Sequence, residues 1–268
     1  MSNQNSWGFF TQNQQSNLDI ELLKKEIGQR FPFYDLKYND NNAAFFCRID
    51  ENTLEQNFDD LRISLSKKGY IPMLKDQHGE QVIYVIKKKI RNDKPFWLNV
   101  ILLIAVIITT VVTGSILYQG FYDIWSMSNP LEIFNPKNLL FGGLLFALPL
   151  MSILFVHEMG HYFISKKHNI ATSFPFFIPI PPILPYFNIG TFGAIISSKE
   201  PMPNKKALFD VGFSGPLAGF LVALPVTIIG IASAEIIPQI SSEIPEGTTI
   251  FGSSFLIQIL VNLIHNLP

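Results

Sequence analysis

The sequence predicts an α-helical polytopic membrane protein, with three to four spans in this chain, that carries a small soluble α+β domain at its N-terminus. The first observation behind this prediction is a split in charge. Residues 1–94 hold 14 Lys and Arg and 13 Asp and Glu, whereas the remaining 174 residues hold only 6 and 8. The second is an uncharged run of 23 residues, Phe96–Tyr118. As a helix this run would extend about 35 Å, enough to cross the hydrocarbon core of a bilayer.

The soluble domain is expected over residues 18–94, after a disordered leader over residues 1–17. Apolar residues recur at helical spacing from about Leu18 to Arg30, and again over 51–70, where Gly69 would end the second helix. The segments AAFFCRI, YIPML and QVIYVIKK are typical of strands, and KDQHGE of a turn between the last two. Cys47 is the only cysteine, which excludes an intramolecular disulfide and a cysteine-based zinc site.

Residues 95–268 are expected to form the transmembrane core. Hydropathy predicts spans over about 96–118, 138–166, 211–234 and 250–266, and the last of these is the weakest. Trp97 and Tyr118 lie near the ends of the first span, where aromatic residues anchor helices at the membrane interface.

The lysines predict how these spans are oriented. The basic cluster 87–94 and five later lysines fall on one side of the membrane if three helices cross in alternation: Lys166, Lys167, Lys199, Lys205 and Lys206. The other side receives the acidic loops, with Asp123, Glu132, Glu235, Glu243 and Glu246. The positive-inside rule therefore places the N-terminal domain on the cytoplasmic side, or its topological equivalent.

An uncharged stretch, residues 171–198, interrupts the helical pattern between the second and third spans. It contains five prolines, which forbid a regular helix: Pro175, Pro179, Pro181, Pro182 and Pro185. One interpretation is an apolar loop lying on the bilayer. The other is a re-entrant extended segment or hairpin in which NIGTFGAIIS forms a strand, and irregular backbone at membrane depth must then be covered by protein or line a wet cavity.

The stretch HEMGH places ionisable residues at the end of an uncharged run. On a helix, His157 and His161 are four residues apart and share a face, so that two imidazoles can hold one zinc ion. Glu158 lies beside them, where it could take a proton from the attacking water and pass it to a leaving amine. Gly160 would let another backbone approach closely. The alternative is a polar patch at a helix end near the interface.

Three features in this order resemble a known family: a membrane helix with HEMGH, a Pro-rich stretch with GTFGA, and a later helix with DVGFSGPLAGF. Over about residues 95–220 the chain resembles the site-2 proteases, the intramembrane zinc metallopeptidases of peptidase family M50. The soluble domain and PFFIPIPP are most similar to the branch of archaea, cyanobacteria and plastids. The resemblance implies that His157 and His161 bind Zn²⁺ and that Glu158 is the catalytic base.

The resemblance also implies a role for the GTFGA stretch. Gly190, Thr191, Phe192 and Gly193 match a hairpin that pairs with an unwound substrate, and strand addition gives a physical reason for such pairing. The implied partners are a membrane-anchored protein substrate and the lipid bilayer. A net charge of −1 gives no indication of a nucleic-acid partner.

The chain departs from the family at the third zinc ligand. The family takes this ligand from an Asp in an NxxPxxxxDG-type motif on a later helix, and no such motif occurs here. Asp210 is the one acidic residue near the third span that could substitute, although it is better suited to capping the helix that starts at Val211. We therefore expect the chain to be part of a longer protein.

The function predicted from these observations is intramembrane cleavage of membrane-anchored proteins by a zinc endopeptidase. The alternative is a proteolytically inactive scaffold or chaperone of the same family. The missing third zinc ligand favours this alternative. A transporter with the Pro-rich stretch as a broken helix is a third interpretation, disfavoured because no inverted repeat is visible.

Overall fold

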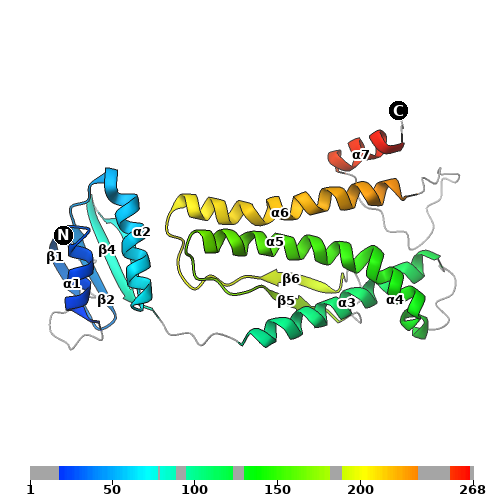
Figure 1. Ribbon diagram of the computed structural model, residues 1–268, viewed down its shortest axis with the longest axis horizontal. Helices are drawn as coiled ribbons and strands as arrows, with labels where there is room; N and C mark the ends of the chain where they lie inside the picture. The colour runs from blue at the N-terminus through cyan, green and yellow to red at the C-terminus, as the bar shows by residue number, and fades with distance from the viewer. Residues whose placement is uncertain are drawn as a thin grey trace, which may run out of the picture. The chain divides into compact units, whose positions relative to one another are not determined.

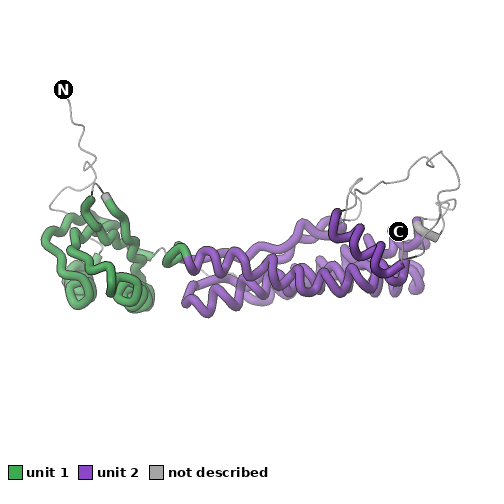
Figure 2. Tube along the Cα trace, turned by 90° about the horizontal axis from the view of Figure 1, so that it is seen from above, with its two compact units in different colours: residues 1–94, 200–205 green, residues 95–199, 206–268 purple. Residues whose placement is uncertain are grey.

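The computed structural model describes residues 18–77, 79–88, 95–122, 130–181, 189–234 and 254–265. The chain divides into two compact units (Figure 2), one of Met1–Lys94 with Glu200–Lys205 and one of Pro95–Lys199 with Lys206–Pro268. The predicted leader 1–17, the turn residue His78, Asp123 and the acidic loop with Glu235, Glu243 and Glu246 lie outside the described residues.

The first unit contains two helices and a four-stranded antiparallel sheet (Figure 1). In chain order these are α1 Ile20–Gly28, β1 Phe33–Tyr38, β2 Asn42–Cys47, α2 Glu51–Lys67, β3 Tyr70–Gln77 and β4 Glu80–Lys87. The strand order is β1-β2-β4-β3. Asp19 and Asp50 cap the two helices, each accepting a backbone N–H with its carboxylate. Strand β1 was not predicted from the sequence, because Asp35 and Lys37 interrupt its apolar pattern.

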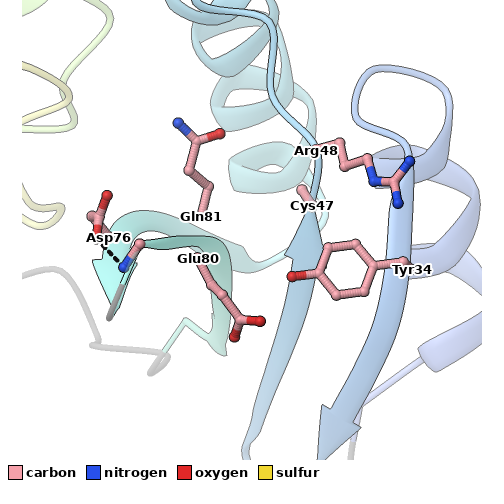
Figure 3. A pocket seen from close by; sticks show the side chains of 7 residues that line it. Tyr34, Cys47, Arg48, Asp76, Glu80 and Gln81 are labelled. Atoms are coloured by element: carbon pink, nitrogen blue, oxygen red, sulfur yellow. Dashed lines mark hydrogen bonds between the residues drawn. The ribbon is translucent and has the colours of Figure 1, made fainter.

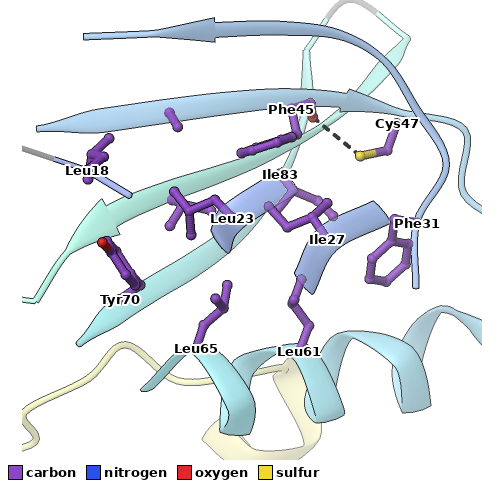
Figure 4. Close-up of a cluster of buried hydrophobic side chains, with 12 residues drawn as sticks. Leu18, Leu23, Ile27, Phe31, Phe45, Cys47, Leu61, Leu65, Tyr70 and Ile83 are labelled. Carbon is purple, nitrogen blue, oxygen red and sulfur yellow. Dashed lines mark hydrogen bonds between the residues drawn. The ribbon is translucent and has the colours of Figure 1, made fainter. Parts of the chain in front are cut away.

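The core of this unit lies between the two helices and one face of the sheet (Figure 4). It is built from side chains that recur at helical spacing on α1 and α2 and from strand residues of one face: Leu23, Ile27, Leu61, Leu65, Phe45 and Ile83. Each such buried side chain contributes about 1.5–3 kcal/mol relative to exposure. This core gives the N-terminal domain the means to fold as a unit.

The second unit is mostly helical. Its elements are α3 Phe96–Tyr122, a 3-10 turn Pro130–Phe134, α4 Pro136–Gly142, a π-helical turn Gly143–Ala147, α5 Leu148–Lys167, β5 Phe176–Pro179, β6 Thr191–Ile195, α6 Lys205–Ala232 and α7 Phe255–His265. The second predicted span is thus a composite of α4, the π-helical turn and α5. Such single π turns inserted in an α-helix commonly accompany functional sites.

Three helical stretches are long and apolar enough to cross a membrane, judged by length and composition: Phe96–Gly120, Pro136–Lys167 and Lys205–Ala232. They are 25, 32 and 28 residues long, and their mean hydropathies are 2.7, 2.5 and 2.0. Large apolar side chains stay exposed on all three, such as Ile104, Leu145 and Phe209. The fourth span was predicted over 250–266, where the structure describes helix α7. This helix has 11 residues and is about 16 Å long, which is shorter than the hydrocarbon core of a bilayer.

The Pro-rich stretch contains an antiparallel pair of strands, β5 and β6. Beyond the strands the two arms stay paired, since Ser173 N–H bonds to Ser197 O at 2.9 Å and Lys199 N–H to Ala171 O at 2.8 Å. Strand β5 contacts α3, and β6 contacts α5 (Figure 1). The intervening residues 182–188, with Pro182 and Pro185, lie outside the described residues.

Side chains of α3 bind carbonyls of this hairpin. The Asn99 amide donates to Pro175 O at 3.2 Å. The Thr109 hydroxyl donates to Gly190 O at 2.7 Å, and the same carbonyl also accepts the Ile180 N–H across the hairpin at 3.1 Å. Hydrogen bonds of this kind make an irregular segment tolerable beside an apolar helix, because a carbonyl left unpaired in an apolar environment would cost several kcal/mol.

Candidate metal centre

Helix α5 brings the two histidines of the motif together. The Nε2 atoms of His157 and His161 are 3.2 Å apart, and the ring planes meet at 77°. This follows from their spacing, because residues four apart on a helix lie one above the other on the same face. Two ring nitrogens are therefore presented side by side to one point in space.

The other ring nitrogen of His161 is bound to the backbone of α6. Its Nδ1 lies 2.6 Å from Val211 O. A carbonyl oxygen can only accept a hydrogen bond, so Nδ1 carries the proton and the lone pair of neutral His161 lies on Nε2. Hydrogen bonds of this kind fix the tautomer and the ring orientation of metal-binding histidines.

The pair fits a zinc ion. Bonds of about 2.0–2.1 Å from zinc to each nitrogen, at a tetrahedral angle, separate two ligand nitrogens by about 3.4 Å. The observed separation of 3.2 Å is close to this value. In the part of the chain that the structure describes, no third His, Cys, Asp or Glu joins the pair to form a metal-binding group. These residues therefore supply two protein ligands of a site that normally has three.

Glu158, the residue after the first histidine, is 7% exposed. Among the described residues no hydrogen bond or ion pair reaches its carboxylate. Burying a carboxyl group without a partner is costly, and such an arrangement is more common at sites of proton transfer than at structural positions. The motif thus combines two metal-competent imidazoles with one carboxyl group that is not engaged elsewhere.

Glycines of α6 make room for the two imidazoles. A Cβ atom on Gly215 would overlap the His161 ring, and one on Gly219 would lie 3.1 Å from His157 Nδ1. On α5, a Cβ atom on Gly160 would lie 2.6 Å from Ser214 O, so the two backbones meet closely at this point. The stretch GPLAG thus keeps the α6 surface flat where the histidines pack.

Asp210 does not occupy the position expected from the sequence. We predicted it as the cap of a helix starting at Val211, but α6 already begins at Lys205, so Asp210 lies in its second turn. Its carboxylate is 2.9 Å from Nε2 of His168, the residue that ends α5. The pair joins α5 and α6 two helical turns from His161. The earlier start of α6 is possible because the lysines at its beginning remain exposed to water.

The four predicted substrate-binding residues differ in their exposure. Gly190 has a φ of 82° and a Cβ atom there would lie 2.6 Å from Thr110 Cα, so this residue packs against α3. Thr191 is 3% exposed, and its hydroxyl donates to Ile178 O at 3.0 Å. Phe192 is 73% exposed, and nothing would crowd a Cβ atom on Gly193. Of the four, only Phe192 is largely exposed.

Several residues that shape this centre were not predicted from the sequence. The Val211 carbonyl gives no side-chain signal, and the His168–Asp210 pair joins residues 42 positions apart. The spacing of Gly215 and Gly219 was a usable signal. Small residues four apart on an apolar helix mark a face where another helix or side chain approaches closely.

A pocket of about 430 Å³ lies in the first unit (Figure 3). It is lined by Tyr34, Cys47, Arg48, Asp76, Gly79, Glu80 and Gln81. Burial raises the pKa of the Cys47 thiol to about 12, so the thiol stays protonated and unreactive near neutral pH. The Asp76 carboxylate accepts the Gly79 N–H at 3.1 Å and closes the β3–β4 turn. These groups serve the fold of the domain.

A helix that presents two histidines and a glutamate in the His-Glu-x-x-His pattern is typical of zinc metalloproteases. The family model for peptidase family M50 matches residues 145–267, which include α5, the hairpin, α6 and α7. This match, together with the relatives below, supports the resemblance to the site-2 proteases that the motifs indicated.

Plant proteins are among the similar sequences. A probable chloroplastic zinc metalloprotease of Oryza sativa subsp. japonica, EGY1, is 32% identical over 112 residues, covering 40% of this chain and 18% of the relative. A probable chloroplastic zinc metalloprotease of Arabidopsis thaliana, EGY2, is 36% identical over 104 residues, covering 39% and 18%. The chain thus spans about a fifth of the length of these relatives. No solved structure matches it.

Proposed function

We propose that this chain carries the zinc-binding part of an intramembrane endopeptidase that cleaves membrane-anchored proteins within or next to the bilayer. The observation that carries the proposal is the pair of facing Nε2 atoms on α5, 3.2 Å apart, with the adjacent Glu158 buried and unengaged among the described residues. His157 and His161 would hold the metal. The match to peptidase family M50 over residues 145–267 supports the same assignment.

Bound zinc would polarise the scissile carbonyl and promote ionisation of water. The chain's own residues supply the rest of the chemistry. Glu158 would accept a proton from the attacking water as its oxygen bonds to the carbonyl carbon, and would pass that proton to the nitrogen as the carbon–nitrogen bond breaks. The Val211 carbonyl would hold His161 in the tautomer that leaves Nε2 available.

The hairpin offers a way to present the substrate. A peptide bond must leave its helix before it can be attacked, because a helical backbone is closed by its own hydrogen bonds. Strand β6 lies beside α5 and pairs only with β5 among the described strands. An extended segment of substrate could add to the other edge of β6, next to Phe192 and Gly193, with backbone hydrogen bonds giving the affinity.

The apolar helices support a location within a membrane, as a multi-pass protein with the N-terminal domain on the cytoplasmic or equivalent side. Three stretches qualify by length and composition, and their exposed side chains are largely apolar. A soluble protein would not leave so much contiguous apolar surface in water.

The test is Glu158→Gln in the natural full-length protein, reconstituted with a membrane-anchored substrate. Removing a general base lowers the rate by about 10²–10⁴-fold, while zinc bound per chain should stay unchanged because the two histidines remain. Glu132→Gln, on the same unit but outside the site, serves as the control. Unchanged cleavage by the Glu158 variant would sink the proposal.

One observation favours the alternative of an inactive scaffold: among the described residues, no third ligand joins the two histidines. The active enzyme and the inactive scaffold should differ in the amount of zinc that they bind. An active enzyme purified in detergent should hold about one zinc ion per chain. The variant His157→Ala should lose this zinc, because it removes one of the three protein ligands that catalytic zinc normally has. A full-length protein that holds no zinc after purification in zinc-containing buffer would favour the scaffold.

A further inference from the structure

A short segment between the hairpin and α6 belongs to the first compact unit. Residues Glu200–Lys205 cluster with Met1–Lys94, whereas Lys199 and Lys206 on either side cluster with the helical unit. We call residues 200–205 the connector. Its sequence, EPMPNK, contains two prolines, which fix φ and make it stiffer than an ordinary loop.

Glu200 is the buried contact of the connector. Only 5% of its side chain is exposed, and one carboxylate oxygen, Oε1, is 2.6 Å from Lys88 Nζ and 2.5 Å from the Ser66 hydroxyl, which donates to it. The other carboxylate oxygen, Oε2, lies 4.0 Å from Nη1 of Arg62. The Arg62 side chain is only 6% exposed. A carboxylate with two cations and a hydroxyl donor satisfies the conditions under which a buried charge is tolerated.

A second, weaker contact holds the other end of the connector. The Asn204 amide donates to the Glu55 carboxylate at 3.3 Å in an exposed position. Both contacts are made with α2 or with the strand end next to it, because Glu55, Arg62 and Ser66 lie on α2 and Lys88 follows β4. The connector therefore lies along α2.

The charge state of Glu200 is set by these partners. Burial by itself would raise the pKa of its carboxyl group, but the hydrogen bonds from Lys88 and Ser66 and the positive charges of Lys88 and Arg62 hold the pKa below its usual value. The carboxylate is therefore ionised near neutral pH. A depressed pKa means that the stabilisation is present above the usual carboxyl pKa of 4.5 and is lost as the pH falls through the lowered value.

The connector is bracketed by two elements of the candidate metal centre. Lys199, immediately before it, donates its N–H to Ala171 O and closes the paired arms of the hairpin. Lys205, its last residue, is the first residue of α6, and Val211, whose carbonyl holds His161, follows six residues later. Fixing the connector thus fixes the chain at the ends of both elements.

We infer that the soluble domain acts as a holder for the connector: Arg62, Lys88 and Ser66 form a receptor for the Glu200 carboxylate, and this anchor restrains the hairpin and the start of α6. The domain therefore holds the stretch of chain that joins the hairpin to α6. Any event that releases Glu200 frees both elements at once. The inference does not depend on the proposed proteolytic activity.

The experiment compares Glu200→Gln with Glu26→Gln in the full chain in detergent. Glu26 is a matched control, since it is also a buried carboxylate held by a lysine and a serine on or next to α2, with Lys68 Nζ at 2.5 Å and the Ser64 hydroxyl at 2.8 Å, but it is not on the connector. Limited trypsin digestion reports cleavage after Lys205. Hydrogen exchange reports residues 189–199 and 206–212.

We expect Glu200→Gln to speed tryptic cleavage after Lys205 by about tenfold or more, because charge-assisted hydrogen bonds are lost. The rate after Lys199 is not compared, since the substitution changes the residue that follows this cleavage site. Exchange should rise in the hairpin and at the start of α6 in this variant alone, while Glu26→Gln leaves all three regions as in the wild type. Equal trypsin rates in wild type and Glu200→Gln would overturn the anchor. Faster cleavage with unchanged exchange in the hairpin and α6 would overturn the restraint.

A pair of charge-reversing substitutions distinguishes loss of the contact between Glu200 and Lys88 from misfolding of a single variant. Glu200→Lys should release the connector, and the added change Lys88→Glu should restore slow tryptic cleavage if the two side chains meet as observed. A double variant that stays as sensitive as Glu200→Lys, while the domain melts at the wild-type temperature, would also count against the anchor.

Discussion

His161 has a defined environment at both ring nitrogens. Nδ1 is fixed by the Val211 carbonyl, and Nε2 faces His157 Nε2 next to Gly215. The side-chain volume at position 215 therefore decides whether the imidazole can keep this place. At the residue scale, the metal centre depends on the absence of a side chain at Gly215 of α6 as much as on the two histidines of α5.

We predict that Gly215→Ala weakens zinc binding by about ten- to a hundredfold, because an added Cβ overlaps the His161 ring and must displace it. Competition with a chelator measures the change. Gly212→Ala is the control on the same helix, since nothing lies within 4 Å of a Cβ atom there. Equal zinc affinity in the two variants would contradict the packing described for α6.

Asp210 is a candidate zinc ligand by its position in the sequence, because it is acidic and precedes Val211, whose carbonyl binds His161. In the structure, however, its carboxylate binds His168. We predict that Asp210→Asn keeps its zinc, because the described residues place no third ligand with the two histidines. Zinc per chain after dialysis gives the answer, and loss of the metal to the level of His157→Ala would make Asp210 a ligand.

At the scale of elements, the hairpin depends on α3. Two polar side chains of an otherwise apolar helix, Asn99 and Thr109, are used to bind hairpin carbonyls. Gly190 brings the hairpin close enough for this, since its positive φ and missing side chain allow contact with the Thr110 backbone. The position of β6 beside α5 therefore rests on contacts from another helix.

We predict that Thr109→Val loosens the hairpin by about 1 kcal/mol without changing zinc content, because one hydrogen bond to Gly190 O is lost and the shape is kept. Hydrogen exchange over residues 189–195 should become faster. Thr227→Val is the control, since its hydroxyl bonds only a carbonyl of its own helix, Ala223 O, at 2.8 Å. Unchanged exchange in Thr109→Val would argue against the support from α3.

At the scale of the whole molecule, three apolar helical stretches alternate with segments that differ in charge. The basic residues before the first stretch, after the second and before the third fall on one side if each stretch crosses once. Orientation then follows from the lysines, whereas the fold of each unit follows from its own packing.

We predict that single cysteines introduced at Lys24 and Lys206 react with an impermeant thiol reagent from the same side of the membrane, and a cysteine at Glu132 from the other. A Cys47→Ser background removes the one native thiol. The reason is the excess of lysine next to the first two sites. Labelling of positions 24 and 206 from opposite sides would contradict the two crossings predicted between them.

The sequence by itself determined the apolar spans, the charged N-terminal domain and the His-Glu-x-x-His helix, because hydropathy, charge and the helical repeat are local properties that a single segment carries. It also carried the resemblance to the site-2 proteases, through HEMGH, GTFGA and GPLAG in that order. Only the tertiary structure decided which partners these residues have. The Val211 carbonyl on His161, the glycine face of α6, the bond between Asp210 and His168, and the anchoring of Glu200 all join segments far apart in the chain, and no local pattern encodes a contact that exists only once the segments have packed.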